Sequence, residues 1–109
     1  MSRSLEVKRL PCIACEIERC EQLSPTEAHH QNLDGKAGQK RLGDEFQVPL
    51  CAWHHRGVTP NGYNKSEATY YFGPSLALDS KQFRFCYGQD WQLLELTNLK
   101  LARLEPVSA

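Results

Sequence analysis

The pattern of apolar and polar positions predicts strands in the first half of this chain. Two brief runs, residues 26–31 and 46–50, suit short strands, and the glycine-rich, basic stretch between them over residues 32–43 is typical of a loop. A short helix is expected to begin near Cys51 or His54 and to end by Gly57. The first half therefore predicts a strand, a loop, a second strand and a short helix.

The last third of the chain carries helical signals. Asn64 can cap a helix that ends at Gly73, and Ser80 can cap a second helix that ends at Tyr87. Asp90 can cap a third helix, in which large apolar residues recur at roughly helical spacing: Trp91, Leu94, Leu101 and Leu104. Residues 64–104 therefore form the predicted helical region.

Length and composition predict the number of domains and the cellular compartment. The chain has 109 residues and 40% hydrophobic content, so it suits one small domain, and chains of this size often need a metal or disulfides for stability. We expect a loosely held charged arm over residues 1–10 and one domain over residues 11–104. Within this domain, residues 11–57 are expected to contain a metal-binding knuckle, formed by closely spaced cysteines, and the core with the two strands and the short helix. The N-terminus lacks an apolar export signal and no stretch could span a membrane, which predicts a cytoplasmic protein.

The charge balance restricts how the chain could bind nucleic acid. Lysine plus arginine and aspartate plus glutamate number 13 each, so the formal net charge is zero. This argues against broad electrostatic binding to DNA, and any contact must come from a local basic patch or a bound cation.

The cysteines predict a structural zinc site. In a reduced compartment clustered cysteines more often bind metal than form disulfides, and zinc favours four thiolate and imidazole ligands. A C-x-x-C…C-x-x-H pattern supplies them: Cys12, Cys15, Cys51 and His54. The alternatives are thiols without metal, or Cys20 as the fourth ligand in place of His54. Cys86, among aromatic residues, is expected to be a small core residue.

All four histidines occur as two adjacent pairs, which predicts a second site. Neighbours on a strand point to opposite faces and neighbours on a helix lie about 100° apart, so each pair must divide its roles. If His54 faces the zinc, the economical arrangement places His29 and His55 on a catalytic divalent ion and leaves His30 as an unligated general base. Asp44 would ligate this ion or orient a histidine. The candidate ions are Mg²⁺, Mn²⁺ and Zn²⁺. The alternative is that both pairs serve the fold alone.

These residues resemble the HNH nucleases, also called ββα-metal or His-Me finger nucleases. Within that superfamily the chain is most similar to the Ref-type RecA-dependent nucleases of phages and prophages. The similarity rests on Cys12-Ile-Ala-Cys15, Ala28-His29-His30, Asp44, the stretch from Val48 through His55, and a second block from Phe72 through Gly88. Two features depart from the family pattern. Asp44 stands in the region of the central asparagine of a typical HNH site, and Arg56-Gly57 follows where related phage proteins often carry another histidine.

The resemblance implies a strand–loop–strand–helix core that grips one divalent ion against the scissile phosphate. It assigns deprotonation of the attacking water to His30 and the ion to His29 and His55, with 5′-phosphate and 3′-hydroxyl products. It also implies a bacterial host cell and a role in phage recombination directed by a RecA filament. This dependence on RecA rests on the family alone.

DNA contacts are predicted at four basic residues, three in the loop and one beside His55: Lys36, Lys40, Arg41 and Arg56. A solvated surface loop is the alternative. The fold class that we expect is α+β, with a small zinc-stabilised ββα-metal core and C-terminal helices, in a monomer or weak dimer. The main alternative function is a non-catalytic zinc-binding module that interacts with DNA or protein.

Overall fold

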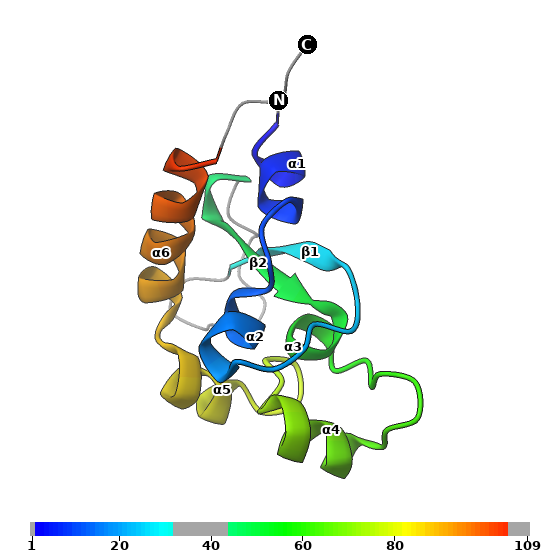
Figure 1. Cartoon of the computed structure of the whole chain (residues 1–109). Coiled ribbons are helices and arrows are strands. Elements are labelled where there is room, and N and C mark those ends of the chain that lie inside the picture. The colour runs from blue at the N-terminus through cyan, green and yellow to red at the C-terminus, as the bar shows by residue number, and fades with distance from the viewer. Residues whose placement is uncertain (1, 32–43, 105–109) are drawn as a thin grey trace.

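The computed structural model describes residues 2–31 and 44–104, and in this part of the chain helices surround a small two-stranded sheet. Strands β1 (Thr26–His30) and β2 (Gln47–Cys51) pair antiparallel. The other elements are α1 (Arg3–Lys8), α2 (Ile13–Glu18), the 3-10 helix η2 (Asp44–Phe46), α3 (Ala52–Arg56), α4 (Lys65–Phe72), α5 (Ser80–Tyr87) and α6 (Asp90–Ala102) (Figure 1). The expectation of an α+β protein with C-terminal helices is confirmed.

The two strands differ in burial, and this difference places the histidines. All five residues of β2 are buried, whereas all five residues of β1 are only partly buried. In the ladder His29 lies opposite Val48 and His30 lies opposite Gln47. Strand β2 is therefore the core strand, and β1 presents its histidine pair at the edge of the folded body.

The core gathers around β2. Helices α1, α2, α3 and α6 all pack against this strand. The buried cluster joins the cysteine-bearing segments to the C-terminal helices, and its largest fully buried members are Trp53, Phe83, Ile13, Leu50 and Val48. The buried indole of Trp53 donates to the Gly73 carbonyl at 2.9 Å, which ties α3 to the end of α4.

Several local signals act as the sequence predicts. Asn64 and Glu67 form a reciprocal capping box at the start of α4. Helix α3 ends at Gly57, whose φ of +73° lies in the left-handed region that glycine adopts easily. Two caps lie one residue earlier than expected, because Asp79 caps α5 and Gln89 caps α6.

The structure corrects three expectations. The N-terminal segment is not a loose arm, because residues 3–8 form α1 and Val7 is fully buried. The core face of α6 is built from Leu93 and Thr97, while Trp91 is 60% exposed. Cys86 is exposed instead of lying in the core. None of the helices in residues 2–31 and 44–104 is long and apolar enough to cross a membrane.

Candidate metal centre and histidine site

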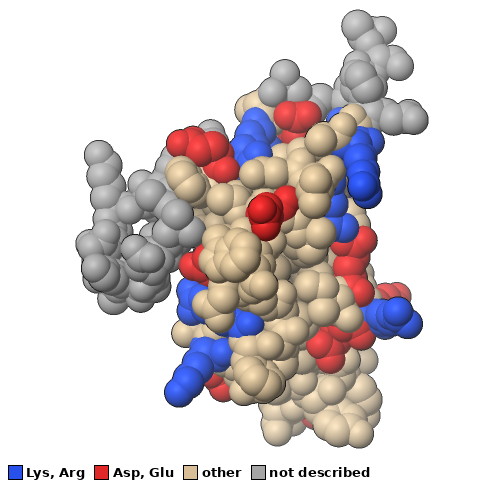
Figure 2. All heavy atoms as spheres, turned by 90° about the vertical axis from the view of Figure 1, so that its left-hand side faces the viewer, with Lys and Arg blue, Asp and Glu red and all other residues tan. Residues whose placement is uncertain are grey.

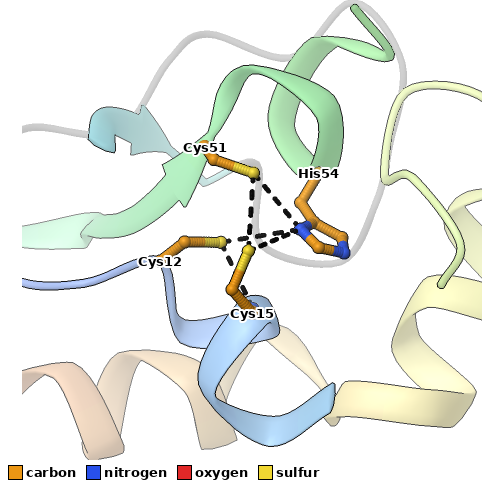
Figure 3. A group of neighbouring side chains, drawn as sticks. All are labelled: Cys12, Cys15, Cys51 and His54. Carbon is orange, nitrogen blue, oxygen red and sulfur yellow. Dashed lines mark hydrogen bonds between the residues drawn. The ribbon is translucent and has the colours of Figure 1, made fainter. Parts of the chain in front are cut away.

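The four predicted zinc ligands lie together in the interior. Cys12 caps the N-terminus of α2 and Cys15 lies in its first turn, so the two sulfurs face the same point. Cys51 ends β2 and His54 lies in the first turn of α3. Figure 3 shows the two pairs converging from α2 on one side and from the β2–α3 junction on the other. Their ligand atoms all lie within 4.8 Å of one another, and all four residues are buried.

The distances within this cluster fit a tetrahedral zinc ion. Zn–S bonds of about 2.3 Å and Zn–N bonds of about 2.0–2.1 Å imply tetrahedral edges of about 3.8 Å between sulfurs and about 3.6 Å between sulfur and nitrogen. The Sγ atoms of Cys15 and Cys51 are 3.8 Å apart. His54 Nδ1 lies 3.6, 3.5 and 3.3 Å from the sulfurs of Cys12, Cys15 and Cys51. These four distances match the expected edges, and the cluster could hold a structural zinc.

His54 is oriented from behind by the backbone. Its Nε2 donates to the carbonyl of Phe72 at 2.6 Å, so Nδ1 is left to face the three sulfurs. The hydroxyl of Tyr87 lies 3.3 Å from the same carbonyl, while its hydrogen is donated to Glu18 at the shorter distance of 2.8 Å. The end of α4 thus determines which nitrogen of His54 is available to a metal.

Contacts within the cluster change the pKa values of its members. Burial lowers the pKa of His54, but hydrogen bonds with Cys12 and Cys51 raise it to about 10. Hydrogen bonds from Cys12 and Cys15 hold the pKa of the Cys51 thiol far below its usual range, while those with Cys12 and Cys51 raise the pKa of Cys15. A metal that binds all four atoms must displace the remaining protons, so its affinity falls as the pH falls.

The second histidine of α3 faces a different partner. The rings of His29 and His55 meet edge to face, with their centroids 4.8 Å apart. Strand β1 supplies one ring and α3 the other, and both residues are only partly buried. The structure therefore brings together the two residues that were predicted to share a catalytic ion. Among the described residues, however, groups of three or more potential ligands occur only at the buried cluster.

Glu27 completes this arrangement, although it was not among the predicted site residues. Its Oε1 accepts a hydrogen bond from His55 Nδ1 at 2.8 Å, which leaves Nε2 of His55 available as a ligand. Glu27 precedes His29 by two residues on β1, so both side chains belong to the same face of the strand. That alternation was a signal in the sequence, but the partner on α3 was not.

Arg56 holds the other side of the Glu27 carboxylate. Its Nε donates to Oε1 at 2.9 Å and its Nη2 to Oε2 at 2.6 Å. Hydrogen bonding to Arg56, followed by that to His55, lowers the pKa of Glu27 even though burial opposes this. The side chain of Arg56 stays half exposed, and its charge is matched locally by Glu27. It supports the histidine pair as well as being a predicted DNA contact.

His30 lies on the other side of the strand from His29. It is the last residue of β1, and its Nε2 is 3.1 Å from the side-chain nitrogen of Gln47 on the paired strand. Asp44 is the first residue of η2, directly before β2. Three predicted DNA contacts lie outside the described residues: Lys36, Lys40 and Arg41.

Charges of both signs are interspersed on the side of the molecule where α6 lies. Figure 2 shows lysine, arginine, aspartate and glutamate scattered around a broad uncharged area on this face. The basic residues in this view form no continuous surface among the described residues, which agrees with the formal net charge of zero. This face is therefore a poor candidate for tracking a DNA backbone.

Comparison with known families gives a match over most of the chain. The family model described as "Recombination enhancement, RecA-dependent nuclease" matches residues 2–102. Comparison with curated proteins gives no match, and comparison with solved structures gives none. The matched range includes helix α1, the whole buried cluster and the His29–His55 pair.

Proposed function

The chain belongs to the family of RecA-dependent nucleases of recombination enhancement, and we propose that it is a metal-dependent DNA endonuclease with an HNH-type core. Membership of this family supports a nuclease role in recombination, with DNA as the substrate and a relationship to RecA. The finer chemistry must come from the residues of this chain.

One observation carries the proposal, namely the approach of His29 and His55 beside Glu27. Two imidazoles with centroids 4.8 Å apart can both ligate one ion. The Glu27 carboxylate accepts from Nδ1 of His55, which is how proteins commonly orient a metal-binding imidazole.

The two metal sites divide the work between stability and chemistry. A structural zinc held by the buried cluster would tie α2 to β2 and α3, and α3 carries His55 directly after His54. His29 and His55 would hold the second divalent ion (Mg²⁺, Mn²⁺ or Zn²⁺), which would supply Lewis-acid polarisation of the phosphoryl group and stabilisation of charge on the departing 3′ oxygen. The buried cluster would thereby fix the position of His55 at the proposed catalytic site.

The remaining residues move the proton and hold the substrate. His30 takes the proton of the attacking water, and Asp44 ligates the ion or orients a histidine. Cleavage on this route leaves 5′-phosphate and 3′-hydroxyl ends. Lys36, Lys40, Arg41 and Arg56 contact phosphates near the cut. Because the chain has no net charge, binding to free DNA is weak, and delivery by a RecA filament compensates.

The test is a cleavage assay on duplex DNA and on displacement loops, with and without RecA filaments, in Mg²⁺, Mn²⁺ or Zn²⁺. We expect divalent-dependent cleavage by the wild type and a loss of roughly 100- to 10,000-fold in His30→Ala, the range of general-base contributions. Lys81→Ala on exposed α5 is the control and should cleave normally.

Zinc content and circular dichroism show whether His30→Ala keeps its fold. Unchanged cleavage by a folded His30→Ala protein would remove His30 from the mechanism. A wild-type protein that binds zinc but cleaves none of these substrates would support the alternative, a non-catalytic zinc module that binds DNA or protein. Ligation of the products without prior phosphorylation checks the predicted chemistry of the ends.

A further inference from the structure

A buried polar network lies beside His30 and is not used by the mechanism above. Its centre is Gln47, which is 1% exposed and pairs with His30 across the ladder. The side-chain nitrogen of Gln47 is 3.1 Å from Nε2 of His30. A buried amide must be hydrogen-bonded, and this one reaches a proposed catalytic residue.

Helix α1 holds this amide in place. The hydroxyl of Ser4 donates to Oε1 of Gln47 at 2.9 Å and accepts from Nε2 at 2.8 Å. Arg3 donates to the backbone oxygen of Gln47 at 3.1 Å and to Oδ1 of Asn98 at 2.8 Å, which fastens β2 to α6. With both of its polar atoms bound, the amide presents one fixed edge to His30.

The orientation of the amide determines the tautomer of His30. With its nitrogen toward the ring, Gln47 donates to Nε2, and the neutral ring carries its hydrogen on Nδ1. Turned by 180°, the amide keeps both contacts with Ser4, because a hydroxyl can donate and accept. The amide oxygen then accepts from Nε2–H, and Nδ1 keeps the lone pair that a base needs. Only the second arrangement lets His30 act as a base while it stays bound to Gln47.

We propose that Gln47 is the positioning residue of His30, with its amide oxygen accepting from Nε2–H in the active enzyme and helix α1 holding the amide through Ser4. This inference rests on the proposed nuclease function for its consequence, but the contact itself can be tested apart from cleavage. It also gives the N-terminal helix a part in the active centre, although it lies far from the histidines in sequence.

Three variants separate positioning from structure. Gln47→Leu removes the contact, whereas Gln47→Glu keeps the shape and supplies oxygens that accept from both Ser4 and His30. Gln31→Leu is the matched control, since Gln31 is equally buried, at 1% exposure, but donates to the backbone oxygen of Asp90 at 2.7 Å. Losses common to Gln31→Leu and Gln47→Leu report the removal of a buried amide alone.

The first readout is turnover at saturating DNA and divalent ion. We expect Gln47→Leu to lose roughly 10- to 100-fold, as for other residues that orient a functional histidine, with an unchanged half-saturating metal concentration. Gln47→Glu should stay within about threefold of the wild type, because a carboxylate can replace the accepting oxygen. A Glu variant as inactive as the Leu variant, or a Leu variant no worse than Gln31→Leu, would overturn the proposal.

The second readout is the side-chain ¹⁵N spectrum of His30 in the zinc-loaded protein without a second divalent ion. The wild type should show one tautomer with its hydrogen on Nε2, and Gln47→Leu should show a mixture. A wild-type hydrogen on Nδ1, or spectra identical in both proteins, contradicts the proposed contact. If neither the wild type nor any of the variants cleaves DNA, the proposed function fails. The spectra would still decide whether Gln47 positions His30.

Discussion

His54 and His55 are neighbours on one short helix and lie in opposite environments. His54 is fully buried, its Nδ1 faces three sulfurs and its Nε2 is bound to a backbone carbonyl. The side chain of His55 is 24% exposed and contacts a carboxylate and another imidazole. A closed set of four donors suits a structural ion, whereas a partly exposed pair leaves room for a substrate. Burial therefore separates the two histidines, and with them the buried cluster from the proposed catalytic site.

The largest effect should come from exchanging each of these neighbours for alanine. His54→Ala removes a zinc ligand and should unfold the protein, because structural zinc contributes about 10–16 kcal/mol in small zinc modules. His55→Ala should keep its zinc and its fold but lose cleavage. Zinc content, near-ultraviolet circular dichroism and the cleavage assay report these outcomes. A folded, zinc-loaded His54→Ala protein would contradict the division between the two sites.

A smaller effect tests the support behind the buried site. Gly73 has a φ of +87°, and a Cβ there would lie 1.9 Å from the Tyr87 hydroxyl that contacts the Phe72 carbonyl. Gly73→Ala should therefore lower the free energy of unfolding by about 2–4 kcal/mol, measured by chemical denaturation.

Gly62→Ala is its control, because Gly62 has a similar φ of +92° but nothing within 4 Å of the added carbon. The loss of unfolding free energy in Gly62→Ala should therefore report the backbone strain alone, without a steric clash. Combining Gly73→Ala with Tyr87→Phe should relieve part of the clash. The double variant should then lose less unfolding free energy than the two single variants lose together. Equal losses in Gly73→Ala and Gly62→Ala would mean that the hydroxyl simply moves aside.

At the His29–His55 site, Glu27→Gln should weaken binding of the proposed catalytic ion without changing the zinc content. We expect the half-saturating concentration of Mg²⁺ or Mn²⁺ in the cleavage assay to rise by roughly 10- to 100-fold, since the carboxylate orients His55. Glu95→Gln is the charge-matched control, because Glu95 is exposed on α6. Loss of zinc from Glu27→Gln would show that the two sites are not separable.

The smallest effect is a pH dependence of stability at Glu27. Hydrogen bonding to Arg56 and then to His55 lowers the pKa of Glu27 in the folded state. Its contribution is therefore present above the unfolded pKa of about 4.3 and is lost as the pH falls through the folded value. The difference in denaturation midpoint between wild type and Glu27→Gln should be largest near neutral pH and shrink in acid. A difference that grows in acid would contradict the assigned direction.

Local signals made much of the fold predictable. The capping box at Asn64, the helix end at Gly57 and the two strands depend on residues a few positions apart, so the chain itself contains the whole cause. The face of α6 was not predictable in the same way. Trp91 is more apolar than Thr97, yet Thr97 is buried, because its hydroxyl donates to the Leu93 carbonyl and the helix packs by that side.

The sequence by itself determined the family, the α+β class and the four residues that now lie within reach of one zinc ion. These follow from residue types at short spacings, which constrain ligand chemistry directly. Only the tertiary structure decided that Glu27 binds His55, that Gln47 lies against His30 and that helix α1 packs on the sheet. Each of these contacts joins residues at least 17 positions apart in sequence. No local pattern encodes such a contact, because it depends on how strand register and helix packing bring distant side chains together.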